Sequence, residues 1–178
     1  QRSVRGYPTP WRIATEYFVL RTLAPRSQGL NAFFGANFDH ESEREAEFLG
    51  GACLLVRREA VDSVGGFDED FFLMSEEVDW CYRFRLAGWK VLFYPGAEVF
   101  HVVGASLNPA QFRRIVRGHL QFLSKHRGAR EAERARRVML WGLRFRGLLY
   151  RGERGRAFRE TARWLGSGKT ATLLESPR

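Results

Sequence analysis

The chain has 178 residues, of which 44% are hydrophobic and 14% are aromatic, and its formal net charge is +9. This length fits one domain, or one domain with a tail, because domains cluster at roughly 100–150 residues. It excludes two complete nucleotide-binding enzymes. The hydrophobic content is sufficient for a packed core and excludes a disordered chain, so we expect a globular protein.

Charge is distributed unevenly along the chain. Residues 1–110 hold 11 Lys and Arg against 15 Asp and Glu, whereas residues 111–178 hold 18 against 5. The second part therefore suits an anionic surface such as lipid headgroups or nucleic acid. The longest mostly apolar run, residues 138–150, contains two arginines and is too short to cross a bilayer, which requires about 20 residues.

The first half of the chain predicts few regular elements. Residues 11–24 are compatible with a helix, and residues 25–47 resemble a loop. The apolar run GACLLVR, residues 51–57, has the length of a buried strand. Residues 58–64 then offer one or two helical turns, which the glycine pair at 65–66 ends.

A helix with an acidic start is predicted between Ser75 and Gly88. The Ser75 hydroxyl can cap the first turn, and Gly88 can end the helix. Negative charge is favoured in the first turn by the helix dipole, and three carboxylates lie there: Glu76, Glu77 and Asp79. Helical spacing places four apolar side chains on one face: Val78, Cys81, Tyr82 and Leu86.

The rest of the chain predicts two strands followed by basic helices. The strands are residues 90–94 and 98–103, and the next helix begins at Asn108-Pro109 and ends at Gly128. Its apolar stripe comprises Phe112, Ile115, Val116, His119, Phe122 and Leu123. Two more basic helices are predicted at about 130–150 and 157–165. We therefore expect an α/β unit over residues 1–107 and a helical, basic extension over residues 108–178.

Several polar residues are candidates for chemistry, each with a structural alternative. The carboxylates at 76, 77 and 79 either face a ligand at the edge of a sheet or only complement the helix dipole. A lone histidine on an apolar strand, such as His101, is usually a satisfied core residue. The run Asp68-Glu69-Asp70 imitates an Asp-x-Asp metal site, but its position after Gly66-Phe67 favours loop capping.

Other chemical signals are absent from the sequence. No nucleotide fingerprint of the GxGxxG or GxxxxGK[ST] type is present. Cys53 and Cys81 lack the spacing of a zinc site, and we expect both to be buried free thiols.

The basic helices have three possible partners: solvent alone, a membrane, or nucleic acid, which is the least favoured. Their aromatic residues at helical intervals suit an interfacial helix better than a base-stacking platform: Trp141, Phe145, Tyr150, Phe158 and Trp164.

Residues 50–106, GGACLLVRREAVDSVGGFDEDFFLMSEEVDWCYRFRLAGWKVLFYPGAEVFHVVGAS, closely resemble the acceptor half of bacterial family 2 glycosyltransferases, most nearly the rhamnosyltransferase-like members. RGYPTPW and LSKHRG fit looser family positions. The resemblance implies a partial GT-A-type fold, a dTDP- or UDP-sugar donor, a divalent metal (Mg²⁺ or Mn²⁺) and inversion at the anomeric carbon. It also implies that the chain is the C-terminal, acceptor-side half, without the donor site.

The resemblance assigns roles to individual residues. The family block reads Glu-Asp-x-Asp, and its second carboxylate, the general base, falls on Glu77, which is longer by one methylene. Glu76 and Asp79 would support this base, with Asp79 better placed to anchor the loop or to help bind the acceptor. His101 resembles a histidine that ligates the metal in some members. The acceptor side of the pocket would be shaped by Gly51, Ala52, Cys53, Phe67 and Asp68.

Two functional hypotheses follow. In the first, the chain is part of a glycosyltransferase that extends a lipid-linked cell-wall or surface polysaccharide, and the helices after Asn108 hold it at the cytoplasmic face of the membrane. In the second, the chain is a noncatalytic, Arg-rich module that binds membrane or nucleic acid.

Overall fold

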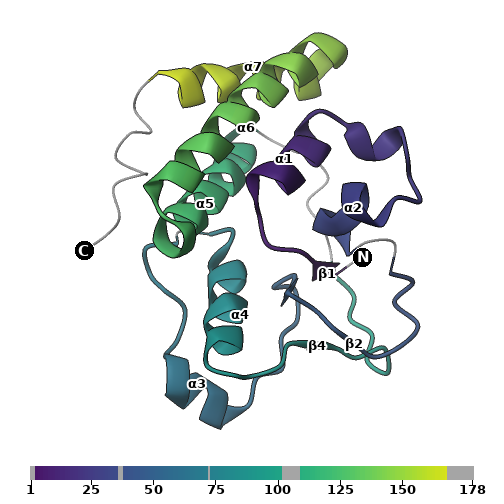
Figure 1. The fold of residues 1–178 in the computed structure, drawn as a ribbon, viewed down its shortest axis with the longest axis vertical. Coiled ribbons are helices and arrows are strands. Elements are labelled where there is room, and N and C mark those ends of the chain that lie inside the picture. Colours follow the sequence, from purple (N-terminus) through teal and green to yellow (C-terminus); the bar gives the residue numbers. More distant parts are fainter. Residues whose placement is uncertain (1–2, 36–37, 72, 102–108, 168–178) are drawn as a thin grey trace.

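The computed structural model describes residues 3–35, 38–71, 73–101 and 109–167. Four helices pack together at one end of the molecule, and α3, α4 and short strands lie towards the other end (Figure 1). The helices of the first group are α1 (Pro10–Tyr17), α5 (Pro109–Arg127), α6 (Ala129–Leu149) and α7 (Gly152–Gly166). The second group comprises α3 (Arg58–Val64) and α4 (Glu76–Leu86). Helix α1 is followed in the chain by the shorter α2 (Gln28–Asn31) and by two 3-10 turns, η1 (Leu20–Thr22) and η2 (Ala32–Phe34).

The three C-terminal helices form largely where the sequence predicts them. Helix α5 begins at Pro109, and Gly128, with φ of +86°, separates it from α6. A positive φ suits glycine, which explains the sharp turn between these two antiparallel helices. Helix α7 begins five residues earlier than expected, at Gly152. Asn108, the predicted cap of α5, lies outside the described residues.

Helix α1 packs closely on α6. It is shorter than predicted because Val19 adopts a left-handed conformation with φ of +57°. A Cβ added to Gly142 would lie 2.5 Å from the Cβ of Tyr17, so only glycine allows this approach. The buried Arg146 donates hydrogen bonds to the carbonyl oxygens of Glu16 and Tyr17, which satisfies the C-terminal end of α1.

The strands are short and form two separate antiparallel pairs. β1 (Val4–Arg5) pairs with β3 (Phe48–Leu49), with Arg5 opposite Phe48, and β2 (Arg44–Glu45) pairs with β4 (Leu92–Phe93), with Arg44 opposite Phe93. Of these four strands, only β4 lies within a strand that the sequence predicts, residues 90–94. The described residues contain no parallel sheet.

Two strand predictions are wrong for the described residues. Residues 51–57 form a turn and extended coil instead of a buried strand, and the side chain of Leu55 is fully exposed. Residues 98–101 also have no strand, while 102–103 lie outside the described residues. A strand requires a neighbour that accepts and donates its backbone hydrogen bonds, and no described segment pairs with either run.

The hydrophobic core is continuous across the predicted domain boundary at residue 107. Buried apolar side chains from β1, α1, α4 and all three C-terminal helices belong to one cluster. At its centre, the Tyr7 ring stacks on Phe48 and Phe122 at centroid distances of 6.0 and 5.6 Å and meets the edge of Tyr82 at 5.1 Å. The division into two domains stays a prediction.

Three predicted details of packing are wrong. Cys81 is buried, but Cys53 is exposed, because its segment forms a surface turn; both thiols are free. Leu86 is 69% exposed, and Phe84 is buried instead. Ser75 occupies the N-cap position of α4, but its side chain makes no capping hydrogen bond, because the residue has a positive φ of 78°.

Candidate functional site

The segment before α4 has an unusual backbone. Leu73, Met74 and Ser75 have φ values of +51°, +90° and +78°. Such conformations cost residues other than glycine on the order of 1–3 kcal/mol each and cluster at functional sites. The segment is pressed against α5, since a Cβ added to Gly118 would lie 2.5 Å from both the Met74 carbonyl oxygen and Ser75 Oγ. The start of α4 is therefore fixed by tertiary packing.

Glu77 is half-buried in the first turn of α4. The turn at Gly51 lies against it, and a Cβ on this glycine would be 3.5 Å from the Glu77 Cβ. Burial raises the pKa of Glu77 above its ordinary value of 4.5, and the charge of Glu76 raises it further. Backbone N–H groups and the guanidinium of Arg5 oppose the rise without cancelling it. The carboxylate is consequently a stronger base than an exposed glutamate.

Unpaired polar atoms are buried beside this carboxylate and in the core behind it. Within the described part of the chain, Glu76 Oε2, Tyr7 Oη and His119 Nδ1 have no hydrogen-bond partner. Burial, with a smaller contribution from Arg5, lowers the pKa of His119 to about 4, so this ring is neutral at neutral pH. Leaving a buried polar atom unpaired costs on the order of 1–3 kcal/mol. Glu76 Oε2 is therefore a buried acceptor whose hydrogen-bonding capacity the described residues do not use.

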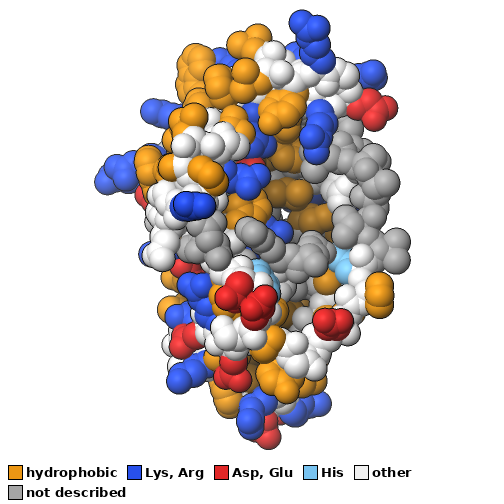
Figure 2. Space-filling view, turned by 90° about the vertical axis from the view of Figure 1, so that its right-hand side faces the viewer, with side chains coloured by type: hydrophobic (Ala, Val, Ile, Leu, Met, Phe, Trp, Pro, Cys, Tyr) orange, Lys and Arg blue, Asp and Glu red, His pale blue; other side chains and the backbone are white. Residues whose placement is uncertain are grey.

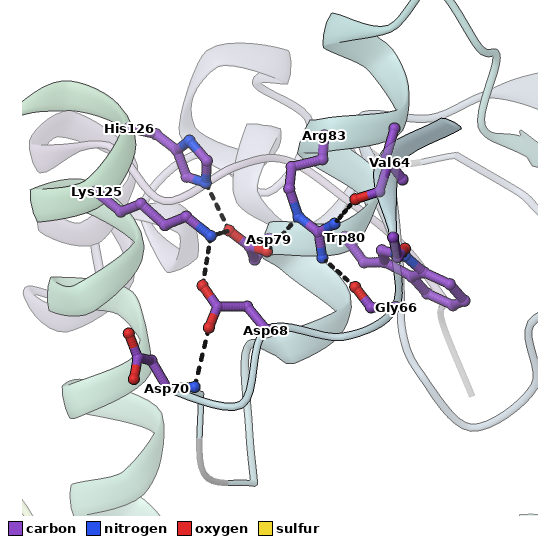
Figure 3. A network of polar contacts seen from close by, with 10 residues as sticks. Val64, Gly66, Asp68, Asp70, Asp79, Trp80, Arg83, Lys125 and His126 are labelled. Carbon is purple, nitrogen blue, oxygen red and sulfur yellow. Dashed lines mark hydrogen bonds and ion pairs between the residues drawn. The ribbon is translucent and has the colours of Figure 1, made fainter. Parts of the chain in front are cut away.

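Asp79 lies at the centre of an ion cluster that joins α4 to α5 (Figure 3). Its side chain is fully buried, and it accepts hydrogen bonds from Lys125 Nζ at 2.8 Å and Arg83 Nε at 2.7 Å. His126 Nε2 lies 2.6 Å from the same carboxylate. Burial alone would raise the pKa of Asp79, but these three partners outweigh burial and hold it well below 3.8. Asp79 thus stays ionised and fully engaged.

The same cluster holds the loop between α3 and α4. Lys125 Nζ also pairs with Asp68 Oδ2 at 2.5 Å, so one ammonium bridges the two carboxylates. Arg83 donates to the carbonyl oxygens of Val64 and Gly66, each at 2.6 Å. Figure 3 shows these groups converging from α4, α5 and the loop. The ion cluster around Asp79 therefore also positions the loop that carries the predicted acceptor residues Phe67 and Asp68.

The predicted acceptor-side residues lie on two surface segments. Gly51, Ala52 and Cys53 form the exposed turn next to Glu77. Phe67 is 51% exposed, and its ring centre is 4.4 Å from that of Trp80 on α4. Asp68 accepts a hydrogen bond from the backbone N–H of Asp70, which is the loop capping expected for this acidic run.

Sequence reasoning missed the cations of the cluster. The spacing of Asp79 and Arg83, four residues apart on one helix, is a local signal that predicts their ion pair. Lys125 and His126 lie in the LSKHRG segment, 46 and 47 residues from Asp79, and no local pattern predicts that contact.

Within the part of the chain that the structure describes, no metal-binding set comes together. His101 lies in exposed coil and not in a buried strand. Across the described ranges, no three His, Cys, Asp or Glu side chains are grouped so that they could hold a metal ion. The described residues therefore do not form a metal centre by themselves. No helix in the described part of the chain is both long and apolar enough to span a membrane.

The part of the chain that contains α4 is similar in sequence to known sugar-transferring proteins. Residues 35–120 match the model of the family described as "Glycosyltransferase like family 2". N-acetylglucosaminyl-diphospho-decaprenol L-rhamnosyltransferase of Mycobacterium tuberculosis is 43% identical over 83 residues, which are 47% of this chain and 27% of that protein. Rhamnosyltransferase WbbL of Escherichia coli is 30% identical over 80 residues, 45% of this chain and 30% of that protein.

Similarity extends to a polysaccharide synthase. The cellulose synthase catalytic subunit of Komagataeibacter sucrofermentans is 29% identical over 93 residues, 51% of this chain and 12% of that protein. No solved structure matches the chain. The chain covers less than a third of the length of each relative named here. The matched residues contain α3, α4 and the loop between them, so this part of the chain is similar to family 2-like glycosyltransferases and to rhamnosyltransferases.

Proposed function

We propose that the protein transfers a sugar such as rhamnose, with inversion, from a dTDP- or UDP-sugar to a hydroxyl group of a lipid-linked cell-wall or surface polysaccharide. The observation that carries this proposal is Glu77, a half-buried carboxylate of raised pKa beside an unpaired oxygen of Glu76. The name of the mycobacterial relative, which specifies rhamnosyl transfer to a diphospho-decaprenol lipid, supports the substrate classes.

Glu77 acts as the general base in this proposal. The acceptor oxygen attacks the anomeric carbon while its proton passes to the Glu77 carboxylate. A new C–O bond forms, the bond from the anomeric carbon to the nucleoside diphosphate breaks, and its electron pair leaves with the diphosphate. Burial raises the pKa of Glu77, which strengthens the carboxylate as a base.

The neighbouring carboxylates have different tasks. Glu76 supports the base: its Oε2 is buried without a partner within the described residues, and its negative charge helps to raise the pKa of Glu77. Asp79 is a positioning residue, because its carboxylate is buried and engaged by Lys125, Arg83 and the His126 ring. It fixes α4 and the loop of Phe67 and Asp68, against which the acceptor would lie.

For the donor side of the reaction, the proposal relies on what is typical of the family. Family 2 enzymes typically use a divalent metal, Mg²⁺ or Mn²⁺, beside the donor diphosphate. His101 remains a predicted ligand of that metal, and the other ligands would come from outside the described residues.

A transfer assay tests the proposal. The natural protein, with any residues that flank this chain, is incubated with dTDP-rhamnose or a UDP-sugar and a diphospho-polyprenol acceptor. We expect a glycosylated lipid, with the anomeric configuration opposite to that of the donor when read by proton NMR. Absence of transfer from every donor, or a retained configuration, would contradict the proposal. The first outcome would favour the noncatalytic, Arg-rich module.

A further inference from the structure

One face of α6 exposes apolar side chains that the core does not use. Trp141, Phe145, Leu148 and Leu149 are 60%, 37%, 85% and 56% exposed, and their spacing places them on one side of the helix. Phe18, after α1, continues the surface, with its ring centre 5.8 Å from that of Phe145. A contiguous exposed apolar surface of this kind marks an interaction site.

Exposed arginines lie on and next to the helix face that carries this apolar surface. Arg144 is exposed on the same face, with its guanidinium carbon 4.9 Å from the centre of the Trp141 ring. Arg151 and Arg154 are exposed where α6 turns into α7. The α6–α7 end lies at the top of Figure 2, where hydrophobic side chains gather among Lys and Arg side chains. We call this surface, comprising Trp141, Arg144, Phe145, Leu148, Leu149, Arg151 and Arg154, the corner patch.

We propose that the corner patch docks on an anionic lipid membrane, with its leucines and aromatic rings at the level of the acyl chains and its arginines among the headgroups. Apolar side chains flanked by arginine are the pattern of interfacial helices. Each Arg near an anionic surface adds attraction, so a few support reversible binding. This inference deepens the proposed function, on which it rests for the lipid-linked acceptor, by naming the surface that reaches the acceptor's membrane.

The charges favour this partner over two others. A second copy of the chain would bring two arginine-rich rims together, and like charges repel. Nucleic acid would pair with the arginines, but it would leave Leu148 and Leu149 without an apolar environment. A membrane with anionic lipid offers acyl chains to the apolar side chains of the patch and negative charge to its arginines.

Vesicle co-sedimentation tests the proposal on the full 178-residue chain. We expect binding to phosphatidylcholine vesicles that contain about 30 mol% phosphatidylglycerol, with weaker binding to phosphatidylcholine alone. Leu148→Asp should weaken binding about 10-fold, because an exposed leucine would no longer enter the acyl region. Arg144→Glu should weaken it by a similar factor, about 10-fold, and reduce its salt dependence.

Matched variants from outside the patch serve as controls. Leu86→Asp changes a leucine that is 69% exposed on α4, and Arg58→Glu changes an exposed arginine on α3. Both should bind vesicles like the unchanged chain. Equal binding of Leu148→Asp and Leu86→Asp would overturn the proposal. So would concentration-dependent dimerisation that Leu148→Asp abolishes, or tighter binding to duplex DNA than to the anionic vesicles.

Two further measurements separate this proposal from the proposed function. Leu148→Asp should keep the rate of transfer to a short, water-soluble acceptor, whereas Glu77→Gln should keep vesicle binding. Failure of all transfer with intact, patch-dependent vesicle binding would refute only the enzymatic proposal. Intact transfer without patch-dependent binding would refute only the docking surface. Unchanged thermal unfolding of Leu148→Asp excludes misfolding as the cause of lost binding.

Discussion

Glu77 and Asp79 lie two residues apart in one helix, but their environments shift their pKa values in opposite directions. Burial raises the pKa of Glu77. The Asp79 side chain is fully buried, yet hydrogen bonds from His126, Lys125 and Arg83 hold its pKa below the ordinary value. A pair of carboxylates whose pKa values are driven apart is typical of a division of roles. We therefore assign proton transfer to Glu77 and positioning to Asp79.

The raised pKa of Glu77 predicts the pH dependence of transfer. Only the ionised carboxylate accepts a proton, so kcat should fall on the acid side with an apparent pKa above 4.5. Asp79 has a lowered pKa, so the stability from its ion cluster is present above pH 3.8 and is lost only as the pH falls below that value. Unfolding through Asp79 is therefore not the cause of the expected loss. A pH–rate profile flat down to pH 4.5 would contradict the assignment of Glu77.

Removal of the Asp79 carboxylate should destabilise the protein strongly. Asp79→Ala leaves Lys125, Arg83 and His126 without their shared partner in a largely buried site, and breaking such a cluster costs about 3–5 kcal/mol. Urea unfolding measures the change. The matched control is Asp62→Ala, which removes an exposed pair with Arg58 at the same helical spacing and should change stability by less than about 1 kcal/mol. Equal losses in the two variants would show that the cluster is not an anchor.

At the scale of elements, the longer helices could be predicted, whereas of the short strands only β4 could. Helix α5 follows from its apolar stripe and from the proline and glycine at its ends, all of which are local signals. A strand depends on a partner elsewhere in the chain, so the apolar run at 51–57 is ambiguous alone. The site divides in the same way: the carboxylates of α4 are visible in the sequence, but the cations on α5 are brought to them only by folding.

The contact between α1 and α6 yields a prediction about packing. In Gly142→Ala the new methyl group would lie 2.5 Å from the Cβ of Tyr17, so the two helices must move apart. Such overpacking costs about 1–3 kcal/mol, and the midpoint of thermal unfolding should fall. Gly166→Ala, at the end of α7, places its methyl group at an ordinary 3.7 Å from Leu140 and should have little effect. A Gly142→Ala variant as stable as Gly166→Ala would contradict the observed packing.

At the scale of the whole molecule, the two proposed activities occupy different regions. The α6–α7 corner lies at the upper end of the view in Figure 1, and α4 lies in the lower half. The core is continuous between them, so binding at the corner patch would hold α4 in a fixed relation to the membrane. This arrangement suits a base that acts on an acceptor carried by lipid.

The transfer rate of Glu77→Gln, measured in the natural protein with saturating donor and acceptor, tests the central claim most directly. Glutamine keeps the shape of the side chain but cannot take the proton, so kcat should fall about 10²- to 10⁴-fold while the thermal unfolding midpoint is preserved. Glu59→Gln on α3 controls for loss of one acidic charge and should keep full activity. A Glu77→Gln protein that transfers sugar as fast as Glu59→Gln would show that another group takes the proton.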